Sequence, residues 1–195
     1  YEVELKSPAS AVDAYTRAID VNPQNFAAMD ALERIHTEQG EWEARIGVKE
    51  RRASGLAEAG DKIHVLLDIA KSWAEDGGQR REGVSALSRV LELEPNHVSA
   101  FTQLEEIYTE NDNWEALVEL YLARVESVES QKDRIGLLHK VARVYETKLD
   151  EPQQAFDALL VAYGEDFQNN KTGDEVERLA AVTQGWAQLL TTANE

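Results

Sequence analysis

Histidine is the residue type in this chain best suited to metal binding and proton transfer, because a neutral imidazole can bind a metal or accept a proton near pH 7. The four histidines are scattered at His36, His64, His97 and His139, and no two lie one helical turn apart. The chain has no cysteine, which excludes zinc–thiolate sites, disulfides and thiol nucleophiles. We therefore predict no metal site. His36 is expected to be a packed or half-buried ring, and His139, beside Arg143 on a helix face, to be an exposed surface residue, with contact to a ligand as the alternative.

Carboxylates are abundant, but their spacing does not match a reactive site. The segment Asn111-Asp112-Asn113 has the composition of a calcium loop, yet it lacks the glycine and the closing bidentate glutamate that such a loop needs. We expect it to be a turn that caps the next helix. Paired carboxylates such as Glu105-Glu106 are expected on solvated helix faces. Glycine-rich phosphate loops and a GxSxG elbow are also missing from the sequence, so we predict no catalytic or cofactor-binding residue, and a protein that is not an enzyme.

The acidic composition limits the classes of partner. Lys and Arg number 20 and Asp and Glu 37, so the 195 residues carry a net charge of −17. Nucleic acids and anionic membranes are bound through cationic side chains, so we expect neither as a partner. No segment approaches the roughly 18 apolar residues of a membrane span. The charge favours a well-solvated surface, with recognition of a basic partner as the alternative.

The start of the chain carries no visible secretion signal. It opens on Tyr1 without a basic segment followed by an apolar run, and a cytoplasmic location is expected. The sequence Asn170-Lys171-Thr172 matches a glycosylation sequon, in a segment predicted to be a loop, but has little meaning without such a signal.

A 72-residue internal repeat organises the sequence. Trp42, Trp114 and Trp186 are separated by this interval, as are Pro23 and Pro95. Shifting the chain by 72 also superposes apolar and small residues at helical spacing, including Leu32 on Leu104, Ile35 on Ile107, Leu66 on Leu138, Ala70 on Ala142, and Ala14 on Ala86 and Ala158. Such agreement is typical of a repeated packing unit. The three tryptophans keep the packing period and are therefore expected in the core, with a ligand-binding box as the alternative.

Apolar residues recur every three or four positions, which predicts amphipathic helices throughout. Breaks at glycine, proline and asparagine delimit eleven helices, paired antiparallel, at about 8–21, 25–39, 41–58, 61–76, 79–93, 97–110, 113–129, 133–149, 151–164, 174–183 and 185–193.

Several of these pairs resemble the tetratricopeptide (TPR) repeat. The residues that carry the resemblance are Leu138, Val141, Ala142, Tyr145, Ala155, Leu159 and Ala162, with Phe167 in place of the closing proline; Leu66, Ile69, Ala70, Trp73, Gly83, Leu87, Val90 and Pro95; and the half-unit Ala11, Tyr15, Ala18 and Pro23. Two units depart from the pattern, because Glu33 and Glu105 replace a small residue. A glutamate there is expected to loosen the helix packing or to turn outward.

The resemblance implies an all-α, right-handed superhelical solenoid, here as a bacterial-type array with a double repeat. We expect one array over 1–195, with a half repeat at 8–23, units at about 25–60, 61–95, 96–131 and 132–167, and a degenerate last unit at 173–195. The last unit is expected to be either a solvated cap or a truncated repeat, and the chain to be a piece of a longer protein. Small residues such as Ala70, Ala86 and Ala142 are expected at close helix contacts.

The same resemblance implies a protein–protein interaction scaffold that binds a protein or peptide on its concave face. The expected partner-binding residues are Asp30, Arg34, Lys71, Thr102, Glu106, His139 and Arg143. Their mixed charges, without an asparagine, fit a peptide of basic character better than a carboxylate clamp. No small-molecule substrate or cofactor is implied. The alternatives are an assembly module of an RNA-processing complex and a repeat region appended to an enzyme.

Overall fold

The chain is all-α. Within residues 7–193, which the computed structural model describes, there are eleven α-helices, one short 3₁₀ helix and no strand, as predicted. In chain order the helices are α2 (Pro8–Val21), α3 (Phe26–Gln39), α4 (Trp42–Gly55), α5 (Ala59–Glu75), η1 (Arg80–Gly83), α6 (Val84–Leu93), α7 (Val98–Glu110), α8 (Trp114–Ser127), α9 (Gln131–Thr147), α10 (Pro152–Glu165), α11 (Asn170–Thr183) and α12 (Trp186–Thr192). The outermost parts of the predicted array, residues 1–6 and 194–195, lie outside the described residues.

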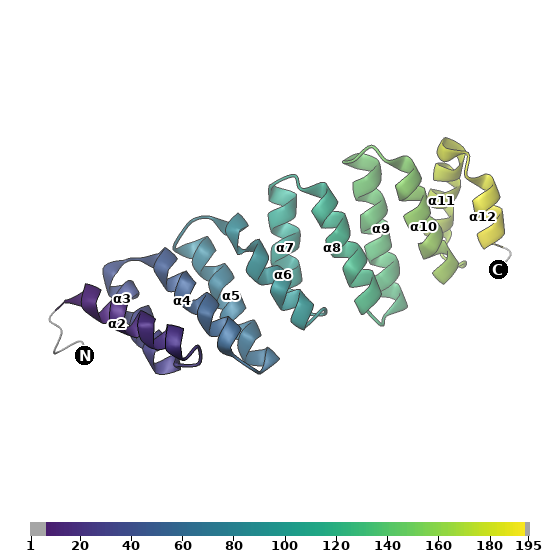
Figure 1. The fold of residues 1–195 in the computed structure, drawn as a ribbon. Helices are drawn as coiled ribbons and strands as arrows, with labels where there is room; N and C mark the ends of the chain where they lie inside the picture. Colours follow the sequence, from purple (N-terminus) through teal and green to yellow (C-terminus); the bar gives the residue numbers. More distant parts are fainter. Residues whose placement is uncertain (1–6, 194–195) are drawn as a thin grey trace. The chain divides into compact units, whose positions relative to one another are not determined.

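The helices form two compact units, Tyr1–Ala100 and Phe101–Glu195, and α7 begins at the boundary. Consecutive helices run antiparallel within each unit (Figure 1). In the first unit α2 packs on α3, α3 on α4, α4 on α5, and α5 on η1 and α6; in the second, α8 packs on α9, α9 on α10, α10 on α11, and α11 on α12. Each unit is therefore a helical-repeat stack. A single continuous array and its right-handed superhelix stay predictions.

Helix starts recur at the 72-residue interval found in the sequence. The first residues of equivalent helices are Phe26, Val98 and Asn170; Trp42, Trp114 and Trp186; and Ala59 and Gln131. The apolar stripes of these helices are buried, with Met29, Leu66 and Leu87 in the first unit and Leu104, Phe156 and Leu159 in the second each at most 2% exposed.

Side-chain caps determine where several helices begin. Asn25 accepts a hydrogen bond from the Ala28 amide before α3, and Ser130 accepts one from the Asp133 amide before α9. Asn169 does the same with the Thr172 amide. Such caps satisfy amides that have no partner within the helix. The prediction that the last unit's first helix starts at 174 was wrong, because this cap starts α11 at Asn170 and places the sequon in a helix, not a loop.

The turn before α8 differs in detail from its prediction. Asp112 adopts a left-handed backbone conformation with φ of 53°, and Asn113 precedes the helix, so the predicted turn is present. However, the Asn113 side chain makes no capping hydrogen bond. The side-chain amide of the neighbouring Asn111 instead donates a hydrogen bond of 2.6 Å to the Ile107 carbonyl, at the end of α7. The predicted capping role was therefore wrong.

Small residues permit close helix contacts. Ala70, Ala86 and Ala142 are at most 4% exposed, and Ala158 is 9% exposed. A Cβ added to Gly83 would lie 3.2 Å from the Ala70 Cα, which shows how closely the chain passes α5. At this contact the segment predicted as one helix over 79–93 is divided into η1 and α6.

The tryptophans of the 72-residue register are not core residues, contrary to the prediction. Trp42 and Trp114 are half-buried, and Trp186 is 47% exposed. Each is the first residue of its helix, so it lies at the end of a helix pair instead of on an apolar stripe. The Trp42 ring packs edge-on against Trp73, with centroids 5.4 Å apart, whereas the Lys148 amine lies 4.4 Å from the Trp114 ring centroid. Among the described residues, no helix is long and apolar enough to cross a bilayer.

Candidate partner-binding surface

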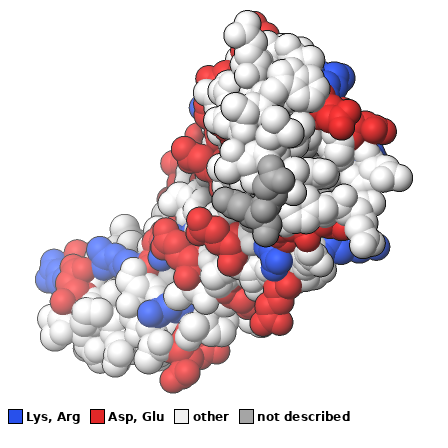
Figure 2. Space-filling model, turned by 90° about the vertical axis from the view of Figure 1, so that its right-hand side faces the viewer, with Lys and Arg blue, Asp and Glu red and all other residues white. Residues whose placement is uncertain are grey.

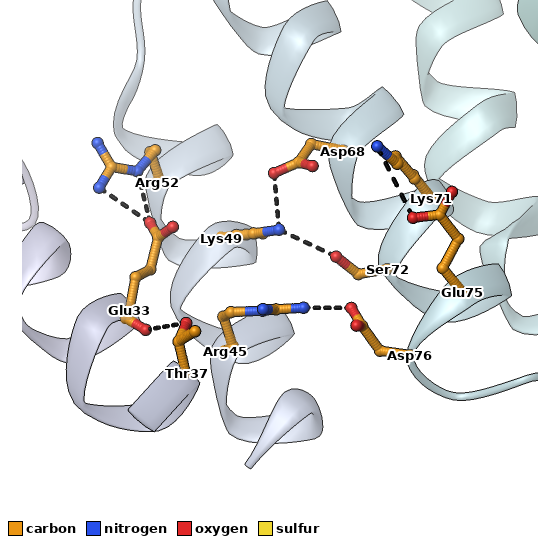
Figure 3. Close-up of polar contacts among 10 residues, drawn as sticks. All are labelled: Glu33, Thr37, Arg45, Lys49, Arg52, Asp68, Lys71, Ser72, Glu75 and Asp76. Atoms are coloured by element: carbon orange, nitrogen blue, oxygen red, sulfur yellow. Dashed lines mark hydrogen bonds and ion pairs between the residues drawn. The ribbon is translucent and has the colours of Figure 1, made fainter. Parts of the chain in front are cut away.

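Three of the predicted partner-binding residues lie in the first unit. Asp30 and Arg34 are on α3 and Lys71 is on α5, and their side chains are 71%, 52% and 64% exposed. Arg34 lies 3.3 Å from the Glu38 carboxylate, one helical turn away. Lys71 lies 3.7 Å from the Glu75 carboxylate, also one turn away (Figure 3). Exposed pairs of this kind contribute only about 0.3–0.5 kcal/mol. Arg34 and Lys71 are therefore accessible to a partner at little cost.

The other four predicted residues lie in the second unit. Thr102 and Glu106 are exposed on α7, and Arg143 is exposed on α9. His139, also on α9, was predicted to be exposed. That prediction was wrong, because its side chain is only 19% accessible. The structure thus places the predicted residues on the first helices of their pairs. One groove that contains all seven stays a prediction.

His139 belongs to a carboxylate–imidazole–hydroxyl series that the sequence did not indicate. Its Nδ1 lies 3.1 Å from Glu175 Oε2, and its Nε2 lies 2.9 Å from Thr172 Oγ1. This order of groups resembles a hydrolase triad. Thr172 is fully buried, however, so its hydroxyl cannot meet a substrate. The series therefore joins α9 to α11. In the described part of the chain no cluster of three or more metal-ligating side chains occurs.

The helices of the first unit are joined by a buried ammonium group (Figure 3). Lys49 on α4 is 7% exposed, and its Nζ lies 2.6 Å from Asp68 Oδ2 and 2.9 Å from Ser72 Oγ on α5. A buried charge is tolerated only when it is paired and hydrogen-bonded. A second pair between the same two helices joins Arg45 to Asp76. We refer to these five residues as the α4–α5 polar layer.

Glu33, which replaces a small residue of the repeat pattern, is not turned outward. Its side chain is 25% exposed and accepts a hydrogen bond from Arg52 Nε on α4 at 3.0 Å (Figure 3). Arg52 also bonds to Asp30. Burial lowers the pKa of Arg52, but the bonds to Asp30 and Glu33 outweigh that effect and raise it. The expected outward turn of Glu33 was wrong because a cation from the paired helix reaches it, and the looser packing given as the alternative stays a prediction.

Glu105 lies 72 residues after Glu33 and, like Glu33, is not turned outward. It accepts hydrogen bonds from the Tyr121 hydroxyl at 2.6 Å and the Lys140 ammonium at 2.7 Å. Burial raises the pKa of Glu105, yet these two bonds outweigh it, so the pKa lies below its ordinary value. Burial and the bond to Glu105 raise the pKa of Tyr121. Tyr121 and Lys140 lie 72 residues after Lys49 and Asp68, so they are the repeat equivalents of that ion pair. The polar contacts between helices at these positions therefore involve different residues in the two units.

The surface charge follows the composition. On the face drawn in Figure 2, acidic side chains outnumber basic ones, and basic side chains lie beside acidic ones. Cross-helix pairs in the second unit include Arg178 with Glu146 at 2.6 Å and Arg134 with Glu165 at 2.9 Å. The hydrogen bond from Arg178 lowers the pKa of Glu146. Much of the cationic charge is therefore used in pairs within the protein.

Comparisons with known proteins give general structural likenesses. No protein-family model matches the sequence, and no curated protein matches it. A crystal structure of MamA protein is 12% identical, with 95% of this chain and 90% of that chain covered and a TM-score of 0.41. A complex of the TPR2AB domain of yeast Sti1 with pHSP90 is 13% identical, with 99% and 84% covered and a TM-score of 0.34. Both TM-scores lie below 0.5, so neither structure indicates a function for this chain.

Proposed function

We propose that the chain is a protein-interaction scaffold that binds a peptide or partner protein through the exposed side of the first helices of its pairs. We call this surface of each unit the first-helix face; six exposed residues define it, Asp30, Arg34 and Lys71 in the first unit and Thr102, Glu106 and Arg143 in the second. His139 contributes by holding α9 against α11.

The division of α3 into a buried and an exposed side carries this proposal. Met29, Leu32 and Ile35 are at most 5% exposed, whereas Asp30 and Arg34 between them face solvent. The apolar stripe of α3 packs against the neighbouring helices α2 and α4, so the polar side of α3 remains for a partner. Stacked helical repeats commonly bind partners along such rows of first helices.

The charges of the first-helix face favour a peptide of basic character. Asp30 and Glu106 supply carboxylates in a chain of net charge −17, which attracts cationic partners over a distance. Arg34 and Arg143 add guanidinium donors suited to peptide carbonyl groups. The proposal includes no catalytic step, cofactor or small-molecule substrate.

Affinity capture with the immobilised chain, followed by mass spectrometry, tests this function. Asp30→Lys and Glu106→Lys are expected to weaken capture of basic proteins about tenfold, since each reverses a charge at the contact. Arg34→Glu and Arg143→Glu are expected to weaken it by removing donors. Glu43→Lys, an exposed change on the second helix α4, is the control and should leave capture unchanged.

Circular dichroism should show the same helix content in all five variants. If capture persists unchanged in the four first-helix variants, this face is not the binding site.

A further inference from the structure

A groove in the second unit is rich in cations although the chain is strongly acidic. It encloses about 440 Å³ and lies among α7, the end of α8 and the first half of α9. We call it the cationic groove; the residues that define it are Phe101, Arg124, Val128, Lys132, Leu137 and Lys140. One acid, Asp133, also lines it.

The floor of the cationic groove is apolar and leaves space for a side chain. Phe101, Val128 and Leu137 are each half-buried, so part of each surface faces the groove. Gly136 lines the groove between the cations, and a Cβ added to it would meet no atom within 4 Å. Partly exposed apolar area in a concave site is stabilised when a partner covers it.

Two of the cations are oriented by aromatic rings. The Arg124 guanidinium carbon lies 5.2 Å from the Phe101 ring centroid, and Lys140 Nζ lies 5.1 Å from that of Tyr121. Cation–π contacts at these distances are attractive and limit side-chain motion. Lys132 is exposed at the start of α9, opposite the end of α8. A bound anion would therefore meet the Arg124 side chain, whose position is restricted by Phe101, with Lys132 beside it; the Lys140 ammonium is itself paired with Glu105 at 2.7 Å.

The internal repeat shows that this charge is particular to the second unit. Three cations line the cationic groove with Asp133, and one of them, Lys140, is paired with Glu105; the equivalent positions 72 residues earlier carry one cation, Arg52, and three acids, Glu33, Asp61 and Asp68. The equivalent pairs that differ are Lys132 with Gly60 and Lys140 with Asp68, while Asp133 corresponds to Asp61 and Arg124 to Arg52. The same backbone pattern thus occurs with fewer cations, although Lys140 also joins α9 to Glu105 on α7.

We propose that the cationic groove binds an acidic peptide segment of a partner protein, in which one large apolar side chain lies between carboxylates. The apolar side chain packs on Phe101 and Leu137 above Gly136, and the carboxylates pair with Lys132 and Arg124. This surface differs from the first-helix face and selects the opposite charge. It therefore adds a second binding site to the proposed scaffold function.

Fluorescence polarisation with labelled synthetic decapeptides and the purified chain tests the proposal. The probe set holds peptides with one central phenylalanine among glutamates, the same peptides with glutamine or lysine in place of glutamate, and with alanine in place of phenylalanine. The glutamate–phenylalanine peptides are expected to bind at least tenfold more tightly than the others and to weaken with added salt. Lys132→Glu should weaken their binding about tenfold.

Lys171→Glu is the matched control, because it reverses an exposed charge in the same unit, on α11, outside the groove. It should change the affinity less than twofold. Converting the groove to its first-unit equivalent, with Lys132→Gly and Lys140→Asp together, should abolish binding. Helix content and thermal midpoint identify variants with altered folding, and Lys132→Glu carries the test if the double variant is unstable.

Three outcomes would overturn the proposal. Equal affinity for acidic, neutral and basic peptides would show that the groove does not select charge. Loss of binding in Arg143→Glu, with binding retained in Lys132→Glu, would show that acidic peptides bind the first-helix face and not the cationic groove. Tighter binding of an oligothymidylate of equal charge would assign the groove to nucleic acid instead.

Discussion

The buried ammonium of Lys49 leads to an asymmetric prediction for the α4–α5 polar layer. Lys49→Met removes the charge but keeps a long apolar side chain, whereas Asp68→Ala leaves the charge and removes its counterion. Lys49 is 7% exposed, but the Asp68 side chain is 55% exposed. We therefore expect Asp68→Ala to be the more destabilising change, although both remove the same ion pair.

The magnitudes follow from what each change leaves buried. After Asp68→Ala, the ammonium retains only the Ser72 hydroxyl at 2.9 Å. Removing one partner of a fully buried pair costs about 3–5 kcal/mol. Because water reaches Lys49 from the Asp68 side, we expect a smaller cost of about 2 kcal/mol. Lys49→Met loses the hydrogen bond to Ser72, of about 1 kcal/mol, and the ion pair with the exposed Asp68, but recovers the desolvation penalty of the ammonium, so its stability should lie within about 1 kcal/mol of the wild type.

Thermal unfolding followed by circular dichroism measures this difference. A chain of this length shifts its midpoint by about 2–4 °C per kcal/mol, so Asp68→Ala should melt about 4–8 °C below the wild type and Lys49→Met within about 4 °C of it. The double variant should resemble Lys49→Met, because no buried charge remains. An equal fall of the thermal midpoint in the two single variants would refute the reasoning. It would show that the buried Lys49 charge costs nothing extra when Asp68 is removed.

Two further predictions concern packing and pH. Ala86→Leu and Ala142→Leu should each destabilise the protein by about 1–3 kcal/mol through overpacking, because both alanines are at most 4% exposed; an unchanged thermal midpoint would contradict the close helix contact. Glu105 has a pKa below its ordinary value of 4.5, so its ionised form stabilises the fold above that pH, and the contribution is lost as pH falls through the folded pKa. Glu105→Gln should therefore melt below the wild type at pH 7, and the gap should close as the pH falls from 4.5; a gap that persists at acid pH would exclude this carboxylate as its source.

Much of the fold could be predicted from the sequence because helix formation and repeat register are local properties. The three- and four-residue apolar spacing identified Leu66, Leu104 and Leu138 as buried, and each is at most 3% exposed. The 72-residue interval also anticipated equivalent helix starts. Caps were harder to recognise: Asn169 begins α11 four residues before the predicted start, because an asparagine in a polar segment fits a loop as well as a helix cap.

The candidate binding surface was predictable only in part. Arg34, Lys71 and Arg143 are exposed as helix periodicity suggests, because their turn positions lie opposite the apolar stripe. His139 shares that periodicity and is nevertheless half-buried, since Glu175 and Thr172 on α11 reach across to it. No single-helix pattern contains that information.

Local patterns in this sequence therefore determined which segments are helical, where equivalent helices begin and which apolar side chains are buried. Only the tertiary structure decided the partners of its charges: Glu33 meets Arg52, Glu105 meets Tyr121 and Lys140, and the cationic groove collects residues from three helices. The physical reason is that helical periodicity acts over three or four residues, whereas each of these contacts joins residues 16 to 35 positions apart, at distances set by how neighbouring helices pack.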